Sequence, residues 1–164
     1  MKDPKTYIPI TEKKDLIPIL SEISIFGGLS EKQLHSVSKL LKKVYYYSGE
    51  YIFRQNTEPS YIYIIRIGEI KIIADIDDTP LEIIALGVGR CFGETSVIGI
   101  SPHSANAIAV EDTELIVLSR ESLLSIFDSD KNLFGLLILN IAREACRRLH
   151  KTDEILLHYV HNKN

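Results

Sequence analysis

FGETSVIGISPHSANAIA, residues 92–109, has the pattern of a strand end, a short helix, a loop and the start of another strand. Gly93 carries no side chain, so backbone can approach a ligand closely there, and Glu94 places a hydrogen-bond acceptor beside it. Residues 95–98 are expected to form about one helical turn. The unpaired N–H groups of that turn would give a small positive pole that suits one phosphate.

The loop that follows is expected to supply the opposite side of the pocket. Pro102 ends the helical segment and directs the residues after it, and His103 and Ser104 would provide a second set of hydrogen-bond donors. From the residues alone, the same pattern is also compatible with a bulged β-corner that binds no ligand.

A resemblance to a known family favours the ligand site. The segment is similar to the signature of the cyclic-nucleotide-binding domain family, in which F-G-E is followed by a short helix and then by P-R-(A/S/T)-A-(T/N). In that family the cyclic phosphate lies against the short helix and the arginine, and the ribose 2′-hydroxyl lies on the glutamate. The resemblance implies cAMP or cGMP as the ligand. It implies a binding site made of Phe92, Gly93, Glu94, Thr95, Ser96, Pro102, His103, Ser104, Ala105 and Asn106.

His103 departs from the family pattern, which has arginine at this position. The change removes a fixed positive charge and a planar fork that grips phosphate with two hydrogen bonds. A hydrogen bond to an ionised group contributes roughly 1.5–3 kcal/mol, so the loss would weaken binding by about one to two decades. One hypothesis is that His103 binds phosphate as imidazolium, with an affinity that falls as the pH rises through about 6.5. Ser104 lies where a hydroxyl is associated with cGMP preference in some family members.

The central part of the chain has the period of β-strands. Many short apolar runs separated by turn residues predict a mainly β domain with flanking helices, and the resemblance makes it a double-stranded β-helix jelly-roll barrel. Gly49, Gly68 and Gly89 are expected at turns, where a positive φ favours glycine. The expected strands are 44–47, 50–54, 61–67, 69–75, 81–86, 104–111 and 115–119.

The helices are expected on either side of these strands. Residues 1–14 are polar and contain two prolines, so they are expected to be a flexible arm. Residues 15–127 would form the cyclic-nucleotide-binding-like barrel domain with its N-terminal helices, and residues 128–164 a C-terminal helical segment. Ser30 and Gln33 form a capping box that begins one of the N-terminal helices.

The C-terminal helix carries an apolar seam that repeats every seven residues, which is typical of a helix with a partner helix. Its members are Ile138, Ala142, Ala145, Leu149, Thr152, Leu156 and Tyr159. We expect a parallel homodimer through Ile138, Ala142, Ala145, Leu149 and Leu156, and the alternative is that the helix folds back onto its own barrel. The resemblance also places a base-capping residue on this helix, near Arg143 or Arg147.

Composition is that of a soluble, ordered chain long enough for one domain. Of the 164 residues, 45% are hydrophobic and 25% are charged, and the formal net charge of −3 gives no general attraction to nucleic acid or anionic lipid. Cys91 and Cys146 lie in apolar contexts without a CxxC spacing and are expected to be reduced and buried. No stretch approaches eighteen uncharged apolar residues, so a cytoplasmic protein without a membrane segment is expected.

The function expected from these observations is a non-catalytic sensor or regulatory module that binds cAMP or cGMP and transmits binding through its C-terminal helix. His103 is isolated in the barrel region, and no Ser-His-Asp, Cys-His or metal-ligand arrangement can be assigned. No recognition helix follows the long helix, so direct DNA binding is not expected. The alternative is a degenerate fold that no longer binds nucleotide and serves as a dimeric protein-interaction module for an unknown partner.

Overall fold

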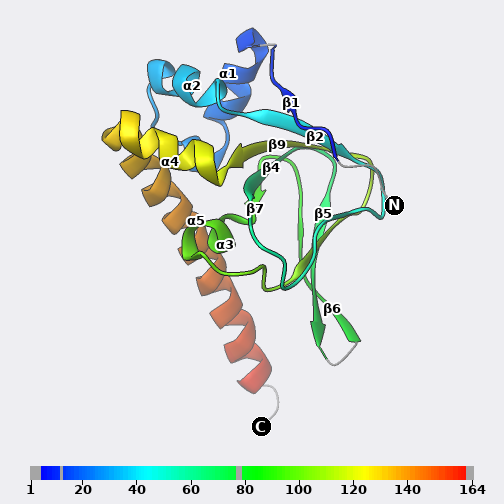
Figure 1. The fold of residues 1–164 in the computed structure, drawn as a ribbon. Coiled ribbons are helices and arrows are strands. Elements are labelled where there is room, and N and C mark those ends of the chain that lie inside the picture. Colours follow the sequence, from blue (N-terminus) through cyan, green and yellow to red (C-terminus); the bar gives the residue numbers. More distant parts are fainter. Residues whose placement is uncertain (1–4, 12, 77–78, 162–164) are drawn as a thin grey trace.

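The chain folds into two antiparallel sheets with helices at one end and along one side (Figure 1). The computed structural model describes residues 5–11, 13–76 and 79–161. In chain order the elements are β1 (Ile8–Pro9), α1 (Lys13–Ser21), the 3-10 turn η1 (Ser24–Phe26), α2 (Glu31–Ser38), β2 (Lys42–Tyr46), β3 (Tyr51–Phe53), β4 (Tyr61–Ile67), β5 (Ile70–Ile76), β6 (Thr79–Leu86), β7 (Cys91–Phe92), α3 (Glu94–Gly99), β8 (Asn106–Ala109), β9 (Thr113–Ser119), α4 (Arg120–Ser129) and α5 (Lys131–His161).

The predicted fold class, mainly β with flanking helices, is confirmed. One sheet has the strand order β1-β2-β9-β4-β7 and the other has the order β3-β8-β5-β6. All the strand pairs are antiparallel. Within the described residues, no ladder joins the two sheets into a closed barrel, so the jelly-roll barrel expected from the resemblance is not seen in that form.

Strand β4 explains how the core divides in two. Successive side chains of a strand point to opposite faces, and in β4 both faces are covered. Ile62 and Ile64 pack with the helices, whereas Tyr63 and Ile65 pack between the two sheets. This is why the run at 61–67 is apolar at nearly every position instead of alternating with polar residues. Burying each isoleucine contributes about 1.5–3 kcal/mol, so the strand is held from both sides.

The starts of two helices follow from local hydrogen bonds, one of which the sequence predicted. The Ser30 side chain accepts from the backbone N–H of Gln33, whose own side chain accepts from the Ser30 N–H, so the predicted capping box at the start of α2 is confirmed. At α5, the backbone N–H of Leu133 donates to Asp130 Oδ1 over 2.9 Å. This bond satisfies one of the N–H groups that a helix start leaves unpaired.

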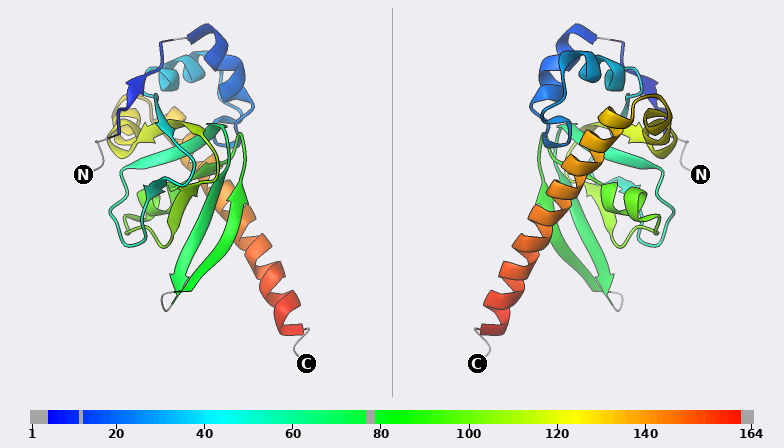
Figure 2. Two further views of the ribbon diagram at one scale, coloured as in Figure 1. Left: turned by 90° about the vertical axis from the view of Figure 1, so that its right-hand side faces the viewer. Right: turned by 90° about the vertical axis from the view of Figure 1, so that its left-hand side faces the viewer.

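Helix α5 is fixed to the helical end of the molecule and then runs past the sheets (Figure 2). Asn140 Nδ2 donates to the carbonyl oxygens of Ile25 and Gly27, over 3.2 and 2.7 Å. The Glu144 carboxylate, whose side chain is 3% exposed, forms an ion pair with Arg90 over 3.0 Å and another with Arg147. These contacts hold the first half of the helix, while its C-terminal half extends in the direction of the β5–β6 hairpin.

Some local features were not predicted. Strand β1 lies inside the segment expected to be a flexible arm, and it pairs with β2. Strand β7 is a two-residue strand that pairs with β4. Such short strands carry too few residues to show a period. Cys91 is buried as expected, and burial raises the pKa of its thiol to about 12. The prediction for Cys146 was wrong in that this residue is exposed, because it lies on the face of α5 that turns away from the core.

Candidate functional site

A cavity of about 670 Å³ lies between the β3-β8-β5-β6 sheet, the segment around α3, and helix α5. Its volume is within the range of small-molecule sites in proteins. The sheet contributes Phe53, Ile72, Ile83 and Ile84, and α5 contributes Ala145, Arg148, Leu149, Lys151 and Thr152. One region of the wall is therefore apolar, whereas hydroxyl and cationic groups gather where α3 and α5 approach each other.

Seven of the ten predicted site residues line this cavity, and the chain segments on either side of α3 bring them together. They are Phe92 and Gly93 before α3, Thr95 and Ser96 within it, and His103, Ser104 and Ala105 after it. The other three are placed differently. Pro102 is exposed on the loop, and Asn106 is buried, where its side chain accepts from the backbone N–H of Gln55 and donates to Asp75. Glu94 is completely buried beneath the cavity wall.

Gly93 is required by the fold at the point where β7 turns into α3. Its φ is 79°, which is the left-handed region that favours glycine. A Cβ built on this residue would come within 3.1 Å of the Tyr61 carbonyl oxygen and of the Tyr63 ring. The space above Gly93 is thus partly taken by strand β4, and any substitution would meet both backbone strain and a close contact.

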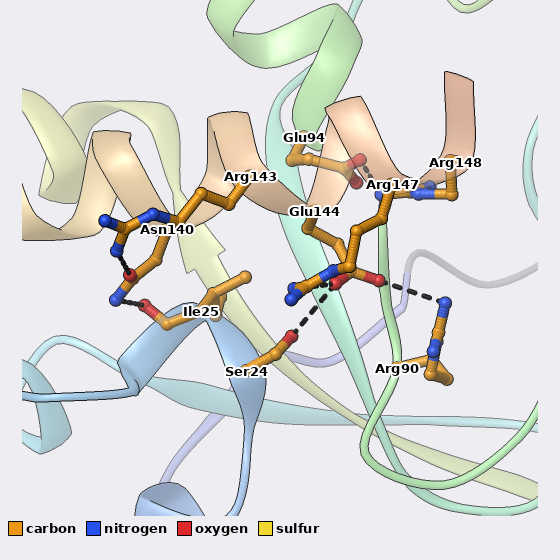
Figure 3. Close-up of polar contacts among 9 residues, drawn as sticks. All are labelled: Ser24, Ile25, Arg90, Glu94, Asn140, Arg143, Glu144, Arg147 and Arg148. Atoms are coloured by element: carbon orange, nitrogen blue, oxygen red, sulfur yellow. Dashed lines mark hydrogen bonds and ion pairs between the residues drawn. The ribbon is translucent and has the colours of Figure 1, made fainter. Parts of the chain in front are cut away.

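Glu94 forms an ion pair with Arg148, a residue that lies on α5 and is 54 positions away in the sequence (Figure 3). Burial raises the pKa of the Glu94 carboxyl, and the positive charge of Arg148 acts against that rise. The second carboxylate oxygen, Oε2, has no hydrogen-bond partner, and neither has the Nε of Arg148. A buried carboxylate with one free acceptor is therefore held under the guanidinium of α5.

His103 is buried against an aromatic ring. Its imidazole is stacked on Phe53, with a distance of 3.6 Å between ring centroids and an interplanar angle of 6°. Burial lowers the pKa of His103 below its ordinary value, so the ring is neutral at pH 7. This placement does not favour the hypothesis of an imidazolium that titrates near pH 6.5. In the structure, the ring is part of the apolar wall.

Sequence reasoning did not find Arg148. It placed the contribution of the C-terminal helix near Arg143 or Arg147, but Arg143 donates to Asn140 and Arg147 pairs with Glu144. A signal for Arg148 does exist in the sequence. The core-facing stripe of α5 consists of Leu133, Leu137, Ile141, Glu144 and Arg148, so two charged residues continue an apolar stripe at helical spacing. Charged groups in such positions are expected to have specific partners.

The residues of the long helix that were predicted to form a dimer seam have different surroundings in the structure. Ala145, Leu149 and Thr152 line the cavity of their own chain, and Ile138 packs against the core cluster. Ala142 is exposed, whereas the side chains of Leu156 and Tyr159 lie outside the described residues. Over this part of the helix, the seam is therefore divided between residues that contact their own domain and Ala142, which is exposed.

The arrangement suits a ligand with two chemically different ends. The aliphatic and aromatic side chains of the sheet offer a surface for a flat apolar ring system. The hydroxyls of Thr95, Ser96 and Ser104, together with Arg148, offer donors for a polar or anionic group. In the described part of the chain, none of the helices is long and apolar enough to span a membrane.

Comparisons with known proteins identify the family of this chain. The family model of the cyclic nucleotide-binding domain matches residues 43–130. The cGMP-dependent protein kinase egl-4 of Caenorhabditis elegans is 34% identical over 110 residues, which are 65% of this chain and 14% of the kinase. The cyclic AMP receptor protein of Thermus thermophilus is 29% identical over 130 residues, 79% of this chain and 58% of the receptor.

Among solved structures, a cyclic nucleotide-binding domain from Methylobacillus flagellatus has a similar fold. The two structures superpose with a TM-score of 0.82 over 93% of this chain and 88% of the other, at 21% sequence identity. Of its curated relatives, the chain spans only about a seventh of the egl-4 kinase and little more than half of the Thermus receptor. The catalytic part of the kinase relatives is not covered by this chain.

Proposed function

The chain belongs to the cyclic nucleotide-binding domain family, and on that premise we propose that it is a non-catalytic sensor that binds cAMP or cGMP. Residues 15–127 would form the binding part, and residues 128–164 the part that transmits binding. The observation that carries the proposal is the cavity of about 670 Å³, because it gathers seven residues of the family signature opposite one face of α5.

The roles of the site residues follow from their chemistry. In this proposal the ribose hydroxyl donates to the Glu94 carboxylate, and the phosphate meets the backbone and hydroxyl groups of Thr95 and Ser96. Ser104 approaches the same group from the opposite loop. The base would lie on the apolar wall, where Phe53 and the His103 ring are already stacked. His103 would thus serve the site as a flat neutral surface.

Transmission would pass through α5, since this helix forms one wall of the cavity. A ligand that contacts Leu149 or Thr152 would have one affinity for the protein with α5 in the position seen here, and a different affinity with α5 in another position. Any such difference shifts the balance between two packings of the helix on the sheets. The first half of α5 is fixed by buried polar contacts, so a shift would be concentrated in its C-terminal half.

Isothermal titration calorimetry with cAMP and cGMP tests the proposal. Binding of either nucleotide at micromolar concentration or below is the expected result. The ratio of the cAMP and cGMP dissociation constants gives the preference between the two nucleotides. A Ser104→Ala variant shows whether the Ser104 hydroxyl contributes to that preference. No heat with either ligand, from a sample that circular dichroism shows to be folded, would refute the sensor.

The second candidate is a dimeric interaction module that has lost its nucleotide. It is favoured by two observations: Arg148 covers Glu94, and burial lowers the pKa of His103, which disfavours a positive charge on the loop. In this case α5 would pair with a second copy through the seam that includes Ala142, whose side chain is exposed. A dimer that light scattering detects, together with a silent titration, would support this candidate over the sensor.

A further inference from the structure

We propose that Arg148 of α5 is the phosphate partner of this site, and that it leaves Glu94 for the ligand's phosphate when a cyclic nucleotide binds. The proposal rests on the proposed function and specifies its chemistry. It assigns the anion contact to the transmitting helix, whereas the family pattern has that contact on the loop at position 103.

Two buried atoms with unused hydrogen-bonding capacity carry the argument. Within the described residues, the buried side-chain N and O atoms without a partner are Glu94 Oε2 and Arg148 Nε. One is an acceptor, the other is a donor, and they belong to the same ion pair. Leaving such groups unsatisfied is costly, so a ligand that satisfies both gains affinity. A ribose hydroxyl next to a phosphate ester provides the matching donor and an anionic acceptor side by side, whereas a neutral nucleoside provides hydroxyls but no anion for the guanidinium.

Access to Glu94 requires Arg148 to move. Glu94 is fully buried and does not line the cavity, while Arg148 contacts Glu94 and does line it. A ligand hydroxyl can therefore reach the carboxylate only if the guanidinium is displaced. The displaced guanidinium stays at the cavity wall as a partly desolvated charge, which requires an anion. The phosphate of the incoming ligand is that anion.

The remaining candidates for an anion partner are weaker. The His103 ring is stacked on Phe53, within the apolar wall. Lys151 also lines the cavity, but it is an exposed residue and its ammonium is a hydrated point charge. Arg148 has 24% side-chain exposure and presents a planar set of donors of the kind that binds phosphate with two hydrogen bonds.

The test compares charged and neutral ligands that share a base and a ribose. The dissociation constants of cAMP and adenosine, and of cGMP and guanosine, are measured for the wild type and for Arg148→Gln. The ratio of nucleoside to cyclic nucleotide dissociation constants is expected to fall on the order of ten-fold or more in Arg148→Gln. Adenosine affinity should be unchanged or higher, because the carboxylate is no longer covered.

Arg147→Gln is the matched control. Arg147 immediately precedes Arg148 on the helix, pairs with Glu144, and does not line the cavity. Its ratio should equal that of the wild type. If Arg148→Gln does not fold, Arg148→Lys keeps the charge beside Glu94 but not the fork, and a smaller fall in the ratio is expected. The double variant His103→Arg/Arg148→Gln, which returns a cation to the loop, should recover the ratio.

The outcomes separate this inference from the function on which it rests. A wild type that binds neither cyclic nucleotide overturns the sensor, and the assignment of Arg148 with it. A wild type that binds, with an unchanged ratio in the folded Arg148 variant, overturns only the assignment. A fall in the ratio in Lys151→Gln, without a fall in Arg148→Gln, would also overturn the assignment of Arg148.

Discussion

Removal of the Arg148 guanidinium should destabilise the folded chain in a pH-dependent way. In Arg148→Ala, the Glu94 carboxylate, which is fully buried in the wild type, loses its countercharge. Breaking a buried ion pair by removing one partner costs about 3–5 kcal/mol. Arg148 is itself 24% exposed, so water can partly replace it, and we expect a loss of about 2–3 kcal/mol in the free energy of unfolding at pH 7.

The sign of the pH dependence follows from the pKa of Glu94. Burial raises the pKa of Glu94 in the folded wild type, and the charge of Arg148 limits that rise, so the variant has a still higher folded-state pKa. A carboxyl with a raised folded-state pKa contributes stability that is present below the unfolded value of about 4.3 and is lost as the pH rises through the folded value. The difference between wild type and Arg148→Ala should therefore be largest at pH 7–8 and narrow toward pH 5.

Urea unfolding followed by far-UV circular dichroism at several pH values measures this difference. Arg147→Ala is the control, because its side chain is 62% exposed and Glu144 keeps Arg90 as a partner, so a cost below about 1 kcal/mol is expected. Glu94→Gln added to Arg148→Ala removes the uncompensated charge and should flatten the pH dependence. A gap between wild type and Arg148→Ala that is the same at pH 5 and pH 8 would refute the reasoning.

Three further variants test separate features. Gly93→Ala should cost about 1–3 kcal/mol of stability, since its φ of 79° and the 3.1 Å contacts both oppose a side chain; thermal unfolding with an unchanged midpoint would contradict this. His103→Arg should tighten cyclic nucleotide binding about ten-fold in calorimetry. Because burial lowers the pKa of His103, the affinity of the wild type should be flat between pH 7 and 8, and a decline there would show a charged imidazole. Ala142→Asp should halve the mass found by light scattering if α5 dimerises, and an equal mass would exclude this seam.

Local features of the fold could be predicted where a residue acts on its own neighbours. Strand β4 was predicted with its observed limits, and the capping box at Ser30 and the positive φ of Gly68 were also predicted correctly. The predicted cavity residues are close in sequence, within α3 and on either side of it, so one motif contains them.

What could not be predicted depends on contacts between distant segments. Arg148 meets Glu94 only because α5 crosses the sheets, and a heptad pattern describes the helix alone without the surface that it meets. Asn106 belongs to the motif, but its amide is used by Gln55, in the turn after β3, and by Asp75 of β5. Burial likewise lowers the pKa of His103, and the ring on which it stacks, Phe53, comes from β3, far from His103 in the sequence.

The buried anchors of α5 have a mechanical consequence. Asn140 and Glu144 would serve as a pivot close to Arg148, the proposed phosphate partner, while about 17 residues, or roughly 25 Å of helix, extend beyond Glu144 to His161. In this geometry a tilt of about 10° at the pivot moves the far end by roughly 4 Å. A rearrangement of one ion pair would thus be converted, by leverage alone, into a displacement large enough for another protein to detect.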